Sequence, residues 1–147
     1  MSNDLERVRR QIEEMHHFIQ DWVSGKAPED DAIEKKLLNR FAGGFMGIMP
    51  GGVGFELGPF REYMRTVHGS NPPFRIQIRN VKVRHRVGDV VVATYEEWEK
   101  AAKDSNPSNN ARQSTMVLRD KGDDFEVLHV HETWLPKDRM EADAYDF

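Results

Sequence analysis

The chain has 147 residues, carries a formal net charge of −4 and contains no cysteine. This length suits a single domain, residues 1–147, with a hydrophobic core of its own, and the lack of cysteine excludes disulfides, thiolate metal sites and cysteine nucleophiles. No apolar run approaches the roughly 20 residues that span a bilayer, the polar N-terminal segment has no signal-peptide core, and charges of both signs are mixed, so we expect a cytoplasmic protein that binds neither membranes nor nucleic acid.

The first half of the chain contains helix patterns. The first helix is expected to begin at a capping-box pair, Asn3 and Glu6, and to end before Gly25. It carries two adjacent histidines, His16 and His17, of which only one can face inward. Its inward positions recur at steps of three and four residues, the spacing of one helix face: Leu5, Val8, Ile12, Met15, Ile19 and Trp22.

Two shorter helices and a glycine-rich strand are expected next. The second helix covers residues 30–41 and has an acidic start, which suits the positive end of a helix dipole. The third starts near Pro59, a residue that favours the first helical turn, and ends at Gly69. Between them, residues 43–52 are glycine-rich and apolar and lack the lysine of a phosphate-binding loop, which predicts a short strand and a tight turn. The inward positions are Ile33, Leu37, Leu38 and Phe41 in the second helix and Phe60, Tyr63, Met64 and Val67 in the third.

Alternating apolar and polar residues replace the helical spacing near residue 74 and predict four β-strands. The strands cover residues 74–87, 90–99, 111–120 and 124–134, with tight turns at 88–89 and 121–123 and a longer connection at 101–110. Helices followed by an antiparallel meander indicate an α+β domain. A curved sheet with helices across one face leaves a space between the layers, and pockets form in such places.

The last predicted strand contains a distinctive pair of polar side chains. His129 and His131 are two residues apart, so both point to one face of the strand, while Glu132 points to the other face, towards solvent or a partner subunit. If the histidines line a pocket, they can act as acid, base, hydrogen-bond donor or metal ligand; otherwise they are held at the edge of the core by neighbouring polar groups. A metal site would need a third ligand, such as His68 or Glu96, so no metal is expected.

A second group of candidates lies on the neighbouring strands. Thr94, Glu96 and Trp98 alternate onto one face. Glu96 is then either a base whose pKa is raised by burial or one half of a salt bridge to Arg112 or Arg79. Arg112 itself either binds the carboxylate of a ligand through two parallel hydrogen bonds or lies exposed at a strand end.

Three segments carry a family resemblance: residues 89–98 (DVVVATYEEW), 113–118 (QSTMVL) and 125–131 (FEVLHVH). Together they resemble the nuclear-transport-factor-2-like superfamily, in particular its SnoaL-like branch and the association domain of calcium/calmodulin-dependent kinase II, to which the His-x-His ending is most similar. The resemblance implies a cone-shaped fold, a deep pocket between sheet and helices, and commonly a homodimer, but no single activity. The chain departs from the kinase domain at Met116, where that domain has an arginine, and no isomerase-type Asp/Tyr pair aligns.

The expected fold is therefore α+β, with three N-terminal helices and a cone-like curved antiparallel sheet that enclose a pocket. The expected function is the binding of a small molecule, with cofactor-independent proton transfer or water loss if the protein is an isomerase, dehydratase or cyclase. The acid–base residues would be His129, His131 and Glu96, and the ligand-binding residues Arg112, Thr94, Trp98, Phe45, Met49 and Tyr63.

Two further expectations concern assembly. Strands that are apolar on both faces are covered on both faces, so we expect a homodimer formed through the outer face of the sheet. The alternative function is a non-catalytic oligomerisation or interaction module. A polar pocket would favour the first function, and a dry, collapsed interior would favour the second.

Overall fold

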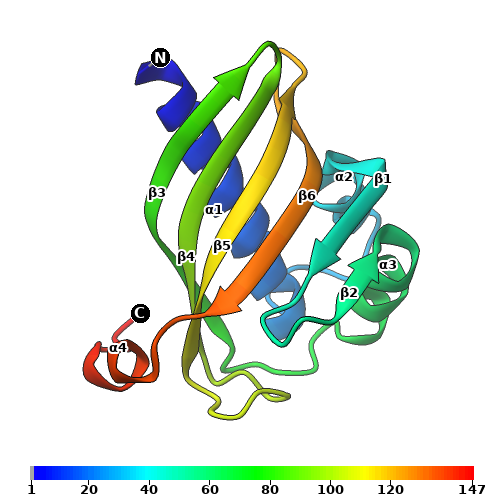
Figure 1. Cartoon of the computed structure of the whole chain (residues 1–147). Coiled ribbons are helices and arrows are strands. Elements are labelled where there is room, and N and C mark those ends of the chain that lie inside the picture. The colour runs from blue at the N-terminus through cyan, green and yellow to red at the C-terminus, as the bar shows by residue number, and fades with distance from the viewer. Residues whose placement is uncertain (1) are drawn as a thin grey trace.

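A long helix lies across the concave side of one curved sheet, as Figure 1 shows. The structure is a computed structural model that describes residues 2–147. In chain order the elements are α1 (Ser2–Ser24), α2 (Ala32–Lys36), the 3-10 helix η1 (Leu38–Arg40), β1 (Phe41–Ile48), β2 (Gly54–Glu56), α3 (Leu57–Thr66), β3 (Arg75–Val87), β4 (Val90–Lys100), β5 (Asn110–Asp120), β6 (Phe125–Trp134) and α4 (Lys137–Ala142). The strands are ordered β2-β1-β6-β5-β4-β3, and all neighbours are antiparallel except β1 and β6, which are parallel.

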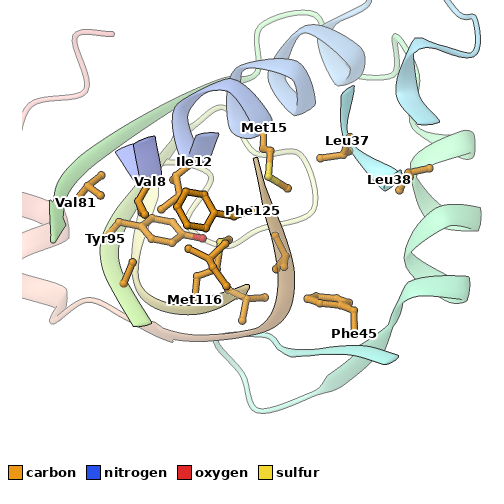
Figure 2. Close-up of a cluster of buried hydrophobic side chains, with 14 of the residues drawn as sticks. Val8, Ile12, Met15, Leu37, Leu38, Phe45, Val81, Tyr95, Met116 and Phe125 are labelled. Carbon is orange, nitrogen blue, oxygen red and sulfur yellow. The ribbon is translucent and has the colours of Figure 1, made fainter. Parts of the chain in front are cut away.

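The apolar stripe of α1 is buried against the sheet (Figure 2). Val8 and Ile12 are fully buried and Met15 is nearly so, which confirms both the predicted stripe and the position of the helix across the concave face. Burying each such side chain stabilises the fold by about 1.5–3 kcal/mol. The sheet residues that they meet in this core include Val81, Tyr95, Met116 and Phe125.

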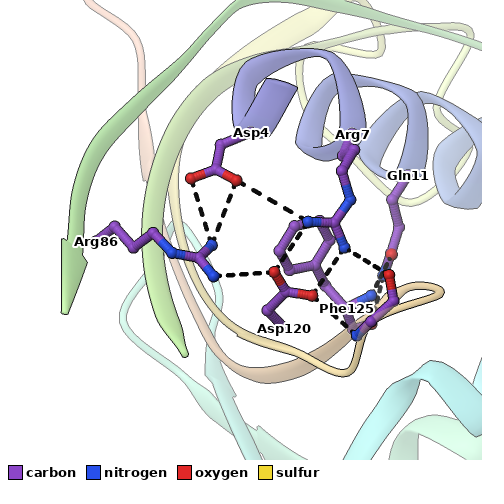
Figure 3. Close-up of polar contacts among 7 residues, drawn as sticks. Asp4, Arg7, Gln11, Arg86, Asp120 and Phe125 are labelled. Carbon is purple, nitrogen blue, oxygen red and sulfur yellow. Dashed lines mark hydrogen bonds and ion pairs between the residues drawn. The ribbon is translucent and has the colours of Figure 1, made fainter. Parts of the chain in front are cut away.

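An ion-pair network joins the N-terminal end of α1 to the turns at one end of the sheet (Figure 3). Arg7 donates to both carboxylate oxygens of Asp120, at 2.9 and 2.7 Å. Arg86 of β3 donates to Asp120 at 3.0 Å and to Asp4 at 3.3 Å. The hydrogen bond from Arg7 is the largest cause that holds the pKa of Asp120 well below its usual range. This end of the space between helix and sheet is therefore closed, and polar side chains gather at the other end, where β4 ends and β5 begins.

The strands follow the sequence pattern closely. The four strands expected after residue 74 are confirmed as β3 to β6, and the glycine-rich segment forms β1 followed by a turn, as expected. Two features were not predicted: the short strand β2, and the parallel pairing of β1 with β6. Parallel pairing joins segments that are far apart in the sequence, so no turn signal marks it.

The helices differ more from the expectation. The predicted helix over residues 30–41 is wrong after Lys36, because the backbone leaves the helical region at Leu37 and is extended at Phe41, where the chain enters β1. Helix α3 begins before Pro59, and Tyr63, expected to point inward, is 52% exposed. The acidic C-terminal segment, which has no clear period, forms α4.

Candidate active site

Six polar side chains gather in the interior at the end of the sheet where β4 ends. We name them the interior cluster: His16, Glu97, Glu99, Arg112, Ser114 and Glu132. His16 comes from α1, and the others come from β4, β5 and β6. They lie on the concave face because they alternate with outward residues in the same way as Tyr95 and Met116, which pack in the core under α1. None of the six side chains is more than 11% exposed.

The register of the strands brings the cluster together. Ser114 pairs with Tyr95 on one side and with Glu132 on the other, and Arg112 pairs with Glu97. Side chains that are directly opposite on neighbouring strands have Cβ atoms about 4.5–5.5 Å apart. The cluster is therefore a property of the sheet itself, and it does not depend on a mobile loop.

His16 and Glu97 form a buried ion pair. The Nδ1 atom of His16 is 2.7 Å from the carbonyl oxygen of Ile12, which can only accept, so Nδ1 carries a proton. The Nε2 atom is 3.1 Å from a carboxylate oxygen of Glu97. Burial is the largest single influence and lowers the pKa of His16, but the charge of Glu97 and the hydrogen bonds with Glu97 and Ile12 together raise it above its ordinary value. Burial alone would raise the pKa of Glu97. The charge of His16 is the first of the opposing influences, and together they hold this pKa well below its usual range.

Arg112 lies between the other two glutamates. Its Nη2 atom donates to Glu99 at 3.1 Å and to Asn110 at 3.3 Å, and its Nη1 atom is 3.5 Å from Glu132. The guanidinium side chain is only 9% exposed. Burial alone would lower the pKa of Arg112, but the charges of the surrounding carboxylates, that of Glu97 first, raise it further above its ordinary value, so Arg112 is always charged.

The three glutamates around this guanidinium cannot all ionise at the same pH, and their pKa values separate. Burial and the charge of Glu97 raise the pKa of Glu99 well above its usual range, and a hydrogen bond between the two carboxyl groups acts in the same direction. Burial and Glu97 also raise the pKa of Glu132 to about 7, against the opposing charge of Arg112. Glu97 is therefore the first of the three to ionise, and Glu132 is divided between both states at neutral pH.

One buried donor of the cluster, the Nε–H of Arg112, has no hydrogen-bond partner within residues 2–147. The hydroxyl of Ser114 has only the phenol of the neighbouring Tyr95 as a partner. Burial, together with the charges of Glu97 and Glu132, raises the pKa of this phenol well above 10, although its hydrogen bond with Ser114 opposes this. Buried polar groups without a partner are rare in folded proteins, so the Nε–H of Arg112 is available to a ligand.

Partly exposed side chains border the cluster, and we name them the rim: Tyr63, Asp104 and Trp134. Tyr63 projects from α3, and burial and the charges of Asp104 and Glu99 raise the pKa of its phenol. Trp134 is 42% exposed, and its ring lies 5.2 Å from the guanidinium carbon of Arg112. The rim therefore places two accessible aromatic rings and one carboxylate beside the interior cluster.

A family model described as the SnoaL-like domain matches residues 16–135, which include the whole interior cluster. The chain belongs to the SnoaL-like family. A solved structure of an NTF-2-like protein of unknown function from Pseudomonas aeruginosa has 27% sequence identity and a TM-score of 0.77, and the match covers 88% of this chain and 99% of that chain. No curated protein sequence matches this chain significantly.

Two more distant structures share the NTF2-like fold of this SnoaL-like chain. A candidate dehydratase of the NTF2-like family from Streptomyces avermitilis has 13% identity and a TM-score of 0.68, over 92% of this chain and 98% of that chain. A structure from Thiobacillus denitrificans, described as a candidate calcium/calmodulin-dependent protein kinase type II association domain, has 18% identity and a TM-score of 0.53, over 69% and 82%. The superfamily expected from the sequence is therefore confirmed.

The two histidines of the last strand lie on the face of the sheet away from α1. Val130, between them, is packed in the core, so alternation points both rings to the outer face. His131 is exposed, and Nδ1 of His129 is 2.6 Å from the carbonyl oxygen of Met46. The predicted cavity shared by these histidines and α1 is wrong, because the apolar residues of β6 fill the core side. A catalytic role for the two histidines stays a prediction.

Glu96 and Trp98 also lie on the outer face, beneath the C-terminal segment. Glu96 accepts hydrogen bonds from Trp98 Nε1 at 2.9 Å and from Arg139 at 3.2 Å. Burial alone would raise the pKa of Glu96, but these hydrogen bonds, that of Arg139 first, leave it lowered. A base with a raised pKa is therefore wrong here, and the salt-bridge alternative is right in kind, with Arg139 in place of Arg79 or Arg112.

The remaining predicted ligand-binding residues are divided between sites. Arg112 is in the interior cluster, where it is neither exposed nor free to bind a carboxylate, and Tyr63 is at the rim. Phe45 is buried in the core, while Met49 follows β1 and is 45% exposed. Thr94 alternates with buried core residues of β4 and lies on the outer face. Of the predicted site residues, only Arg112 and Tyr63 therefore belong to the interior cluster and its rim.

Five of the six members of the cluster, all but Arg112, were outside the predicted site. Glu132 was expected in solvent or at a dimer interface, which is wrong, because its side chain is only 11% exposed. His16 is the one of the adjacent pair that faces inward. The sequence did contain evidence for the cluster. Tyr95, Glu97 and Glu99 share one face of their strand, and pairing the two strands as a hairpin places Ser114 and Arg112 beside them on that face.

Two open hollows lie elsewhere, along α1. One, of about 400 Å³, is lined by residues that include Asp21, Lys26 and Arg75, and the other, of about 320 Å³, is lined mainly by charged residues of the same helix. Neither is lined by a buried titratable cluster. Across residues 2–147, no three His, Asp or Glu side chains are grouped to hold a metal ion, and none of the helices has the length and apolar character needed to cross a membrane.

Proposed function

We propose that this SnoaL-like protein is a cofactor-independent acid–base enzyme, in which Glu132 transfers a proton to or from a small molecule at the interior cluster. The observation that carries the proposal is a buried carboxyl group with a pKa of about 7, placed 3.5 Å from Arg112. A general acid or base works best when its pKa is near the operating pH, because both of its states are then populated.

The neighbours of Glu132 have matching roles. Arg112 supplies a fixed positive charge, and its free Nε–H and the hydroxyl of Ser114 can donate to an oxygen atom on which negative charge develops. The ion pair of His16 and Glu97 holds one side of the site in a single protonation state. Isomerisation of a carbonyl compound or loss of water beside a carbonyl group both need this arrangement, and the Streptomyces avermitilis relative is described as a candidate dehydratase.

The polar interior also favours an enzyme over the alternative function, a non-catalytic interaction module. A non-catalytic interaction module needs no buried titratable groups, and replacing a buried ion pair by packed apolar residues is often neutral or stabilising. Six buried polar side chains on one concave face therefore support the catalytic function.

Proton exchange provides the test. In D₂O, NMR spectroscopy would follow the loss of α-proton signals from a panel of small ketones and β-hydroxy ketones. We expect Glu132→Gln to slow the exchange by about 10²–10⁴-fold. Glu126→Gln is the matched control, because Glu126 lies on the same strand but pairs with Arg119 at the surface. Exchange that is unchanged in Glu132→Gln, or absent across the whole panel, contradicts the proposal.

We further propose a homodimer through the outer face of the sheet. Val92, Thr115, Val117 and His131 are only half-buried or exposed there, and α4 covers the sheet only near Trp98. Light scattering should give twice the chain mass at micromolar concentration. Val117→Arg should give the monomer mass, and Val87→Arg, at the exposed end of β3, should remain dimeric. A monomer in the unmodified protein contradicts this proposal.

A further inference from the structure

The interior cluster contains more acidic groups than basic ones. The carboxyl groups of Glu97, Glu99 and Glu132 surround one guanidinium, Arg112, and one imidazole, His16. Even with the imidazole protonated, full ionisation would leave one negative charge in excess. The rim adds another carboxylate, and no basic side chain is among the groups that influence its tyrosine. Burial and the charge of Glu97 accordingly raise the pKa of both Glu99 and Glu132.

Arg112 is not available for an anionic ligand. Both of its terminal nitrogens are occupied by Glu99 and Glu132, at 3.1 and 3.5 Å. A ligand carboxylate would have to displace one of these groups and would add a fourth carboxyl group beside Glu97, Glu99 and Glu132. Burying an uncompensated charge costs several kcal/mol, roughly 3–5 when one partner of a buried pair is lost.

We infer that the site takes a small protonated amine that also carries a hydroxyl or carbonyl oxygen. The inference rests on the proposed function for the location of the site and adds the class of its substrate. The ammonium group would lie beside Glu99 and Glu132, the two carboxyl groups that flank the guanidinium of Arg112. The ligand oxygen would accept the hydrogen bond that the Nε–H of Arg112 does not make within residues 2–147.

The rim suits the same ligand. Tyr63 and Trp134 are about half exposed, and the faces of aromatic rings attract organic cations. Asp104 lies close enough to Tyr63 to raise the pKa of its phenol, so a negative charge and an aromatic ring are close together beside the cluster. A cation approaching from solvent is therefore attracted at the rim before it reaches the buried carboxyl groups.

Binding of a cation must also release protons. A positive charge beside Glu99 and Glu132 favours their ionised forms, and without it the pKa values of both carboxyl groups are raised, that of Glu132 to about 7. An amine should therefore displace up to about one proton per ligand at pH 6.5. A neutral ligand should displace almost none, and an anion should take protons up.

Three ligands of the same shape distinguish these outcomes: 2-amino-1-phenylethanol, 1-phenyl-1,2-ethanediol and mandelate. They present an ammonium, a hydroxyl and a carboxylate group, respectively, beside the same hydroxyl-bearing carbon. Isothermal titration calorimetry of the unmodified protein at pH 6.5, in two buffers with different ionisation enthalpies, measures both affinity and proton release. We expect the amine to bind at least about tenfold more tightly than the diol, a difference of about 1.4 kcal/mol, with mandelate weakest.

The Glu99→Gln variant tests whether the preference for the amine arises from this carboxyl group. It should weaken binding of the amine about tenfold more than binding of the diol, and it should reduce the proton release. Glu126→Gln is the control, and circular dichroism checks that both variants are folded. If Glu99→Gln does not fold, the two-buffer experiment on the unmodified protein still decides. Equal or tighter binding of mandelate, amine binding without proton release, or no binding of any of the three ligands overturns the inference.

The outcome is separate from that of the proposed function. If the amine binds and releases protons but no α-proton exchanges, the proposed ligand class is supported and the proposed catalytic role is wrong. If proton exchange on neutral ketones depends on Glu132 but the protein does not prefer the amine, the catalytic role stands and the proposed ligand class is wrong.

Discussion

Replacing Glu132 by glutamine should remove a defined part of the pH dependence of folding. Its carboxyl pKa is about 7 in the folded protein, compared with 4.5 for the same group in its ordinary environment. The folded protein therefore binds this proton more tightly than the unfolded chain, so the stabilisation is fully present below about pH 4.5 and is lost as the pH rises through 7. At about 1.36 kcal/mol per pH unit, the shift corresponds to about 3 kcal/mol.

Urea unfolding at pH 5 and at pH 8 would measure this effect. The unmodified protein should lose about 2–3 kcal/mol more stability between these two pH values than Glu132→Gln does. The raised pKa values of Glu99 and His16 also reduce stability as the pH rises, but these residues remain in the variant, so most of their contribution cancels in the comparison. Glu126→Gln should behave as the unmodified protein does. The same pH dependence in Glu132→Gln as in the unmodified protein would refute the reasoning.

Three further predictions test the packing and the placement of residues. Ile12→Ala, at a fully buried position under the sheet, should cost about 2–5 kcal/mol of unfolding free energy, and a loss below about 1 kcal/mol would contradict the core described for α1. Asp120→Asn should cost about 1–2 kcal/mol in low salt and less in high salt, because it weakens pairs with two arginines, and a loss that does not depend on salt would argue against an ionic origin. Diethyl pyrocarbonate, followed by mass spectrometry, should modify the exposed His131 and leave His16 unmodified until the chain unfolds; early modification of His16 would show that the cluster is open to solvent.

The sequence predicts those helices and strands whose buried residues recur at a regular spacing. The three-and-four spacing from Leu5 to Trp22 and the alternation after residue 74 both result from burial of one face, so helix α1 and strands β3 to β6 follow from them. The pairing of β1 with β6 depends on contacts between distant segments. Helix α4 is stabilised by contacts around Trp98, on a face that the sequence pattern leaves unassigned.

The site was missed because alternation shows which residues share a face but not which face is concave. In β4 both faces carry an aromatic residue and a glutamate, Trp98 with Glu96 and Tyr95 with Glu97. The large tryptophan favoured the wrong face, since its burial is provided by the C-terminal residues around Leu135 and not by α1. In β6 the paired histidines drew attention for the same reason. The irregularity between Val127 and His129 puts the buried Val127 and the histidines on opposite faces, and simple alternation does not show it.

A direct titration of Glu132 tests the central claim, that the interior cluster is an acid–base site. Carbon-13 NMR spectroscopy of the glutamate side-chain carboxyl signals, with the resonance assigned by its disappearance in Glu132→Gln, gives the pKa of this group. The structure predicts a midpoint near 7. A midpoint near the ordinary value of 4.5 would show that Glu132 is ionised throughout the physiological range, and it would contradict the proposed role in proton transfer.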